Sequence, residues 1–142
     1  MSSILCLWKY KNYLKDRDSK LLEESPSFNS HQNRLHSAIE FGERAYLVTY
    51  LEGQCYLVGR IIITEQYFNE PNYEYGEFGI SGELPESQYF EFGLIDITMV
   101  LRQLRFKTSK IIGNSPLPLS LHLQTIRELT EDDVALLDSL IP

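Results

Sequence analysis

The fold is decided by residues 42–65, GERAYLVTYLEGQCYLVGRIIITE. Two runs in this stretch, Ala45–Tyr50 and Cys55–Thr64, consist mainly of β-branched and aromatic residues, which favour strands. The four residues between them, Leu51–Gln54, include Gly53, whose permissive backbone suits a hairpin turn. The stretch therefore predicts a long antiparallel hairpin, and with it a small α+β or barrel domain.

On the N-terminal side of the hairpin, Ser3–Trp8 alternates weakly and predicts a first strand, and Tyr10–Lys15 can begin a helix. Residues 16–33 are polar and contain a proline, which predicts a surface loop. Three apolar residues spaced i, i+3 and i+4 predict a short helix before the hairpin: Leu35, Ala38 and Ile39.

After the hairpin, Asn69–Tyr75 predicts a loop because it contains a proline and two asparagines. Two further strands are expected at Glu77–Leu84 and Gln88–Phe92. Side chains alternate between the two faces of a strand, so Phe90 is expected in the core and Tyr89 in solvent.

The C-terminal third predicts two helices. Residues 96–104 begin with a capping aspartate and carry an apolar face, and the pair Thr130 and Asp133 resembles a capping box at the start of a C-terminal helix. Between these helices, Ile111–Ile112 predicts a short strand, while Leu119–Ile126 fits a strand and a helix equally well.

Composition indicates one domain over residues 1–142, since a chain of this length with 43% hydrophobic residues can bury one core. The longest apolar runs are far too short to span a membrane. The N-terminus lacks the features of a signal peptide, and the two cysteines, Cys6 and Cys55, lie in apolar runs as buried free thiols do. We therefore expect a cytoplasmic protein with no membrane partner.

The net charge of −7 argues against a protein that coats nucleic acid indiscriminately. Cations are concentrated in two segments, Lys9–Lys20 and Ile97–Ile126. The second segment has no carboxylate and carries Arg102, Arg105, Lys107 and Lys110. If the two segments meet, they form one positive face on an acidic body; the alternative is that these are ordinary solvated charges.

The sequence carries no catalytic signature. The three histidines, His31, His36 and His122, lack the spacing of metal ligands, so neither a metal nor a cofactor is expected. The glycine-rich stretch 76–82 has no following lysine and is not a phosphate loop. Glutamates are so frequent between residues 65 and 91 that no acid–base pair stands out. The sequence therefore favours a non-enzyme.

Aromatic residues exceed what a small core needs. Eight of them fall in a window of 26 residues: Tyr67, Phe68, Tyr73, Tyr75, Phe78, Tyr89, Phe90 and Phe92. Tyr73 and Tyr75 lie in a predicted loop, where rings are harder to bury. Exposed rings can stack on bases or line a pocket, or they can fold back over a sheet edge.

Three segments carry a resemblance to a known family: Ile4–Lys9, a strand that ends in Trp; Phe41–Val48, a Gly–acid step into the hairpin; and Val58–Ile61 on the return strand. Over residues 3 to 65 the chain resembles the PUA-like superfamily, which includes the EVE and YTH domains. The resemblance implies an α+β fold with a mainly antiparallel, partly open β-barrel, flanked by short helices and a C-terminal helix. In that family a cleft often holds a flipped or modified base.

The resemblance implies binding roles for Trp8, Lys9 and Arg60; the alternatives are a core tryptophan and a surface cation pair. Rings at Tyr73 and Tyr75 would stack on the base. The cations of the second basic segment would hold phosphates: Arg102, Arg105, Lys107 and Lys110. The expected function is thus a non-enzymatic module that binds RNA or DNA, with a modified or flipped base as the recognised group.

Two alternatives stay open. The first is a protein-interaction or assembly subunit that uses the acidic, aromatic segment 67–92 as its contact surface. The second is a small-ligand-binding protein or hydrolytic enzyme, which would need a deep pocket with converging carboxylates.

Overall fold

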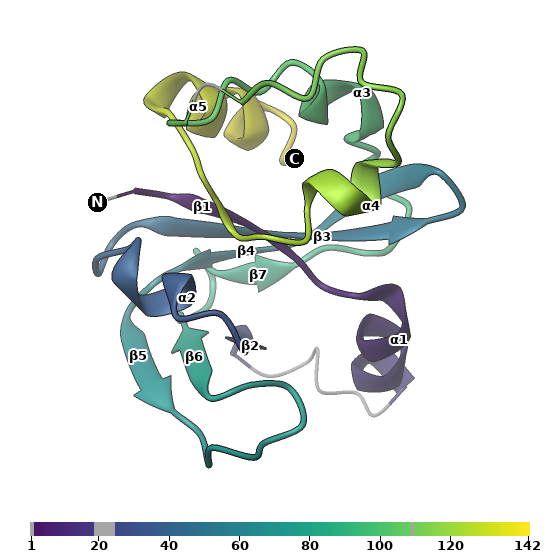
Figure 1. Cartoon of the computed structure of the whole chain (residues 1–142). Coiled ribbons are helices and arrows are strands. Elements are labelled where there is room, and N and C mark those ends of the chain that lie inside the picture. Colours follow the sequence, from purple (N-terminus) through teal and green to yellow (C-terminus); the bar gives the residue numbers. More distant parts are fainter. Residues whose placement is uncertain (1, 19–24, 109) are drawn as a thin grey trace.

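The computed structural model describes residues 2–18, 25–108 and 110–142, which form two β-sheets and several short helices (Figure 1). The strands are β1 (Ile4–Leu7), β2 (Ser27–Ser30), β3 (Arg44–Leu51), β4 (Gln54–Ile62), β5 (Glu65–Phe68), β6 (Phe78–Ser81), β7 (Gln88–Tyr89) and β8 (Arg127–Glu128). The helices are α1 (Tyr10–Asp18), α2 (Arg34–Ser37), α3 (Thr98–Leu101), α4 (Leu119–His122) and α5 (Glu131–Ser139).

The main sheet has the order β7-β4-β3-β1-β8, and the small sheet has the order β2-β6-β5. Helices α3, α4 and α5 lie on one side of the main sheet, and α1, α2 and the small sheet lie on the other (Figure 1). We call these the α5 side and the α1 side. All strand pairs are antiparallel except β1 with β3. The α+β class is confirmed, but the described strands form two open sheets and do not close into a barrel.

The predicted hairpin is confirmed as β3 and β4. The turn consists of Glu52 and Gly53, both with positive φ, at 51° and 85°. This backbone twist is the one that joins two twisted strands most directly. The register shifts between Leu47 and Val48, where a bulge adds a residue to one strand.

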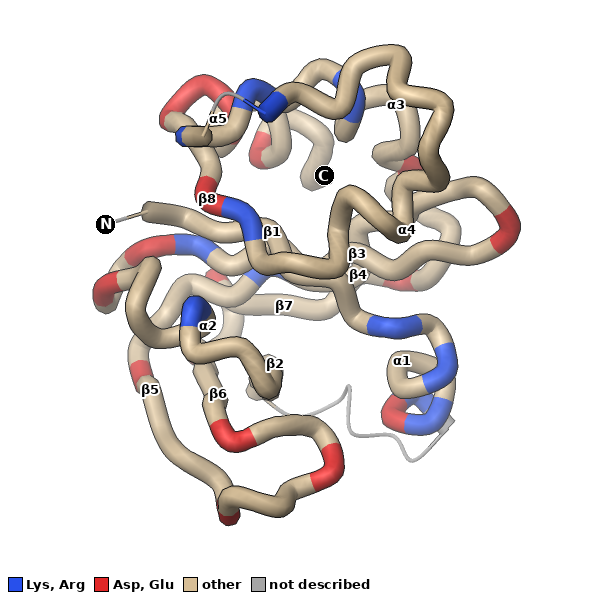
Figure 2. Tube along the Cα trace, viewed as in Figure 1, with Lys and Arg blue, Asp and Glu red and all other residues tan. Residues whose placement is uncertain are grey.

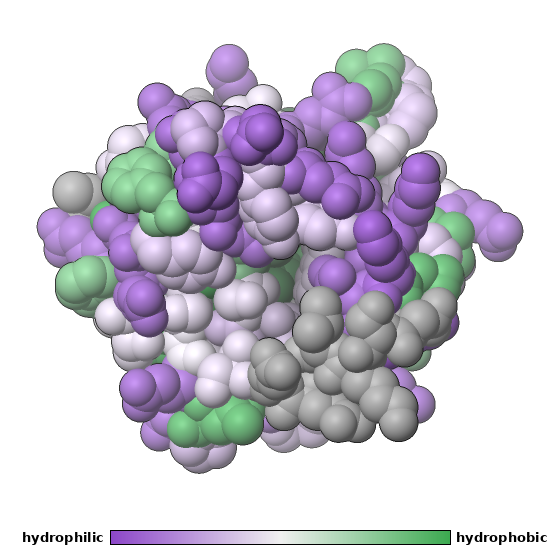
Figure 3. Space-filling view, turned by 90° about the horizontal axis from the view of Figure 1, so that it is seen from below, coloured by the Kyte–Doolittle hydropathy of each residue, from purple (hydrophilic) through white to green (hydrophobic). Residues whose placement is uncertain are grey.

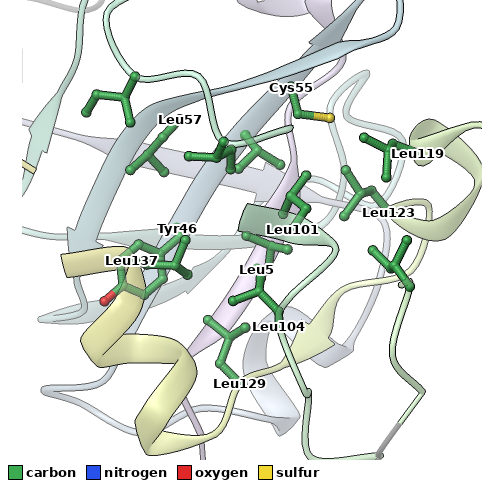
Figure 4. Close-up of a cluster of buried hydrophobic side chains, with 14 of the residues drawn as sticks. Leu5, Tyr46, Cys55, Leu57, Leu101, Leu104, Leu119, Leu123, Leu129 and Leu137 are labelled. Carbon is green, nitrogen blue, oxygen red and sulfur yellow. The ribbon is translucent and has the colours of Figure 1, made fainter. Parts of the chain in front are cut away.

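Apolar side chains cover both faces of the main sheet. On the α5 side, Leu5 and Tyr46 pack against helices α3 and α5 in a cluster of buried leucines (Figure 4). On the α1 side, Ile4 and Cys6 pack against the small sheet and α2. Each fully buried side chain of this size contributes about 1.5–3 kcal/mol relative to exposure. The central strands are therefore buried on both faces and hold the two layers together.

The C-terminal helix α5 begins as predicted. The Thr130 hydroxyl accepts a hydrogen bond from the Asp133 amide, and the Asp133 carboxylate accepts one from the Thr130 amide, each at 3.1 Å. Helix α3 is shorter than residues 96–104, although Asp96 accepts a hydrogen bond from the Thr98 amide at 2.9 Å as a cap does. The stretch Leu119–Ile126 fitted a strand and a helix equally well, and its first half forms helix α4.

The prediction of a loop over residues 16–33 is wrong in part. Helix α1 extends to Asp18, and Ser27–Ser30 forms β2; residues 19–24 lie outside the described residues. Strand β2 pairs with β6 and buries Phe28. Its residues have little strand propensity, so the pairing comes from tertiary contacts. Conversely, Ile111–Ile112 is not a strand.

None of the described helices has both the length and the apolar character that crossing a membrane requires.

Candidate functional site

A cavity of about 570 Å³ lies on the α1 side of the main sheet. Its described lining comes from the end of β1 and helix α1, from β2, from the β5–β6 loop, from β7 and from the segment before β8. Pockets that bind small molecules commonly span about 300–1,000 Å³. Figure 3 views the molecule from this side and shows hydrophobic atoms deep in a hollow among mostly polar neighbours. The cavity therefore has the size of a ligand site.

Three aromatic rings in contact form one wall of the cavity, which we call the aromatic wall: Trp8, Phe28 and Tyr89. Trp8 lies between the other two. It follows β1, and its amide donates to the Val48 carbonyl at 2.7 Å, which fixes the chain where it turns into α1. The indole lies 6.3 Å from the Phe28 ring and 5.7 Å from the Tyr89 ring, between ring centroids. Trp8 is only 7% exposed, so it is a core residue that also lines the cavity.

Tyr89 completes this wall, and the prediction that it faces solvent is wrong. Its hydroxyl accepts a hydrogen bond from the Ser27 amide at 2.9 Å and donates one to the Ser27 carbonyl at 3.0 Å. Burial raises the pKa of Tyr89. Strand alternation does not place this residue correctly because β7 has only two residues, and β2 of the small sheet covers the face that was expected to be open.

The β5–β6 loop brings Tyr73 and Tyr75 to the cavity, where their rings pack edge to face with centroids 5.5 Å apart. Lys15 of α1 lies 5.6 Å from the centre of the Tyr75 ring, and its ammonium is 3.6 Å from the Glu74 carboxylate. These contacts, with Tyr75 first, raise the pKa of Lys15. The loop is thus tied to α1 across the cavity.

Gly76 allows this loop to approach β2. Its φ is 118°, a conformation that side chains disfavour, and a Cβ there would collide with the backbone of Ser30. His31, next in the chain after β2, places its Nε2 atom 3.1 Å from the Glu74 carbonyl oxygen. The close approach of the two backbones therefore depends on glycine.

Polar groups complete the lining. Asp16 of α1 lies in the cavity, where burial raises its pKa and Lys15 opposes that effect. The side-chain Nε2 of Gln32 donates to the Gln124 carbonyl, and its Oε1 accepts from the Ile126 backbone amide, each at 2.8 Å. Gln32 thereby holds the segment before β8 against the cavity. The site combines flat apolar walls with donors and acceptors at the rim.

Four of the predicted site residues meet at the cavity: Trp8, Lys9, Tyr73 and Tyr75. Arg60 does not. Its side chain lies on the α5 side of the main sheet, where Nη1 is 3.2 Å from the Asp138 carboxylate and Nη2 donates to the Glu86 carbonyl at 3.3 Å. The Tyr46 hydroxyl donates to the same carboxylate at 2.6 Å, so Arg60 helps to hold α5 on the sheet.

The cations of the second basic segment also lie away from the cavity (Figure 2), although the end of that segment, before β8, lines it. Arg102 donates to the Gly113 carbonyl at 2.8 Å and so braces the segment after α3. Three other cations of this segment are exposed and do not line the cavity: Arg105, Lys107 and Lys110. The described cations of the first segment belong to α1 and its start, on the opposite side of the main sheet; Lys20 lies outside the described residues. Of the two alternatives, the one in which the cations meet on one positive face is therefore not seen among the described residues.

Sequence reasoning missed several residues of the site, namely Asp16, Phe28, Gln32 and Tyr89. Phe28 carries the one usable signal, because it is the only aromatic residue in the polar stretch 16–33. A single aromatic ring in such a stretch indicates local burial. The other three give no local signal, since tertiary contacts alone bring them to the cavity.

The two cysteines are buried and free. Burial raises the pKa of Cys6 well above its ordinary value and that of Cys55 to about 12, so the thiols stay protonated and are poor nucleophiles. Among the described residues there is no group of three or more His, Cys, Asp or Glu side chains that could hold a metal ion.

Comparisons with known proteins do not assign a family. No protein-family model matches the chain, and no curated protein matches it. The resemblance to the PUA-like superfamily accordingly stays a prediction.

Proposed function

We propose that the chain is a non-enzymatic module that binds one base of a nucleic-acid strand in the cavity beside Trp8. The single observation that carries the proposal is the grouping of Trp8, Tyr73, Tyr75 and Tyr89 around one cavity of about 570 Å³. Proteins that extrude a base from a strand read it by stacking on aromatic rings and by hydrogen bonds to its edges. Each aromatic stack contributes about 1–3 kcal/mol.

The polar rim supplies groups for the edges of such a base. Asn12 and Asp16 lie on one face of α1, and their side-chain oxygens can accept hydrogen bonds from an exocyclic amino group of the base. The side-chain amide of Asn12 can also donate a hydrogen bond. A modified base is the finer form of the proposal, because the aromatic rings offer apolar surface to an added methyl group. PUA-like domains, which the chain resembles, commonly hold such bases.

The arrangement of charge changes which cations would hold phosphates. Lys9 lines the cavity and Lys15 lies at its loop, whereas Arg105, whose amide donates to Asp133 of α5, lies on the other side of the main sheet. Because few of the described cations lie at the site and the net charge is −7, binding depends on the base more than on phosphate contacts.

The test is the affinity for single-stranded RNA and DNA oligonucleotides, with and without base methylation, across a salt series. We expect Lys9→Ala to weaken binding and to reduce the slope of log affinity against log salt by about 0.7 for each lost phosphate contact. Arg105→Ala is the matched control and should change neither quantity. Absence of binding even at low salt contradicts the proposal, and so does an effect of Arg105→Ala as large as that of Lys9→Ala.

The hydrolytic alternative has less support. Among the described residues, two carboxylates line the cavity, Asp16 and Glu74, and the Glu74 carboxylate forms an ion pair with Lys15. That partner gives Glu74 a structural role in closing the loop on α1. The other alternative, a protein-interaction subunit, is supported by the open edge of strand β5.

A further inference from the structure

Strand β5 has an open backbone edge. It is the last strand of the small sheet, and no other described strand pairs with its outer side. The Asn69 amide donates to the Glu77 carbonyl at 2.7 Å, and Tyr67 pairs with Gly79. In an antiparallel pair alternate residues direct both backbone groups to the partner strand. The N–H and C=O groups of Gln66 and Phe68 therefore point away from the sheet.

Apolar side chains flank this edge. Phe68 is 70% exposed, and its ring meets His36 at 5.0 Å and Phe78 at 5.8 Å between centroids. Phe41, 68% exposed, stands beside a shallow groove that is also lined by Ile39, Glu40 and Gln66. Protein edges are commonly protected by Pro or Lys, and β5 carries neither. We call Glu40, Phe41, Glu65, Gln66 and Phe68 the β5 edge surface.

The charge of the β5 edge surface decides between occupants. Glu40, Glu65 and the nearby Glu70 are exposed, and none of them forms an ion pair with another described residue. A second copy of the chain would bring the same carboxylates and a net charge of −7 to the contact, which is unfavourable. A basic segment would meet complementary charge.

We propose that the β5 edge surface binds an extended segment of a partner protein in which basic and apolar residues alternate. The segment adds to the small sheet as a fourth strand next to β5. The backbone groups of Gln66 and Phe68 pair with it, an apolar side chain enters the groove beside Phe41, and Lys or Arg side chains meet the glutamates. This surface shares no residue with the cavity lining, so the proposal is independent of base binding.

The probe is an end-capped heptapeptide of sequence KVKVKVK, titrated into the full chain by calorimetry. We expect saturable 1:1 binding. A peptide of the same sequence with an N-methyl group on every backbone amide keeps the charge but has no N–H donor on either edge, so it cannot form the ladder. EVEVEVE keeps the ladder but reverses the charge, and neither peptide should bind. The double variant Glu40→Lys/Glu65→Lys should lose at least about tenfold in affinity.

Phe41→Ser should weaken binding several-fold, and Met99→Ser is its matched control, because Met99 is equally exposed at 68% on the α5 side. Absence of KVKVKVK binding overturns the proposal. Equal binding of the N-methylated peptide also overturns it, since charge alone would then explain the affinity. A dimer in light scattering that Phe41→Ser dissociates would assign the edge to a second copy instead.

Discussion

The Tyr89 hydroxyl is hydrogen-bonded to both backbone groups of Ser27, at 2.9 Å to the amide and 3.0 Å to the carbonyl. Tyr89 belongs to β7 of the main sheet and Ser27 to β2 of the small sheet. One side chain therefore links the two sheets behind the cavity. Because the Tyr89 ring also packs on Trp8, this link sets the position of the aromatic wall.

Tyr89→Phe removes both hydrogen bonds and leaves two backbone groups of Ser27 without a partner. We expect the free energy of unfolding to fall by about 1–3 kcal/mol, measured by urea denaturation. Tyr56→Phe is the control, since the Tyr56 hydroxyl bonds to an exposed Gln54 side chain and its loss should cost less than about 0.5 kcal/mol. Equal costs for the two variants would show that Tyr89 does not link the sheets.

Gly76→Ala tests the approach of the β5–β6 loop to β2. The new Cβ meets the Ser30 backbone at a φ of 118°, so we expect a loss of at least about 2 kcal/mol and a displaced Tyr75. Gly93→Ala is the matched control: Gly93 has a φ of 89° with open space around it, and only the backbone strain of about 1 kcal/mol should appear. Urea denaturation of both variants measures the difference, and a Gly76→Ala protein no less stable than Gly93→Ala contradicts the close contact.

Asp133→Ala should be among the most destabilising single changes in the chain. The carboxylate is buried and accepts hydrogen bonds from the amides of Arg105 and Phe106, each at 2.9 Å, as well as from Thr130. Its loss leaves these donors unpaired, and we expect at least about 3 kcal/mol by thermal or urea denaturation. The exposed neighbour Asp132 is the control, and Asp132→Ala should cost under about 1 kcal/mol. A small effect at Asp133 would contradict its role between α5 and the segment after α3.

Asp16 makes the stability of the folded chain depend on pH. Its pKa is raised by burial, so the folded state holds the proton more tightly than the unfolded chain does. The stability from this group is present below about pH 4 and is lost as the pH rises through the raised pKa. We expect the wild type to lose stability relative to Asp16→Asn when the pH is raised from about 3 to about 6. Urea denaturation at both pH values measures this shift, and the opposite sign would place Asp16 in a charge-stabilising environment.

The local parts of the fold could be predicted from the sequence. The hairpin follows from its strand residues and from Gly53, and α5 follows from Thr130 and Asp133, because these signals act within a few residues. Strands β2, β5 and β8 could not be predicted in this way. All three are short, and the hydrogen bonds of β2 and β8 come from strands distant in the sequence, so their own residues carry little signal.

The same distinction holds for the site. Trp8 and Lys9, selected through the resemblance, follow a predictable strand, and Tyr73 and Tyr75, selected as rings that are hard to bury, lie in a predictable loop; all four line the cavity. The cations of the second basic segment could not be placed, because the sequence does not show on which side of the main sheet that segment returns.

Trp8 is the only tryptophan in the chain and lines the cavity, so its fluorescence reports directly on what enters. The most direct test titrates the protein at low salt with a single-stranded oligonucleotide. A second titration uses a strand of equal length that is abasic at every position. We predict saturable quenching of Trp8 by the base-bearing strand and none by the abasic strand. Equal quenching by both, or no quenching by either, would contradict the claim that this cavity holds a base.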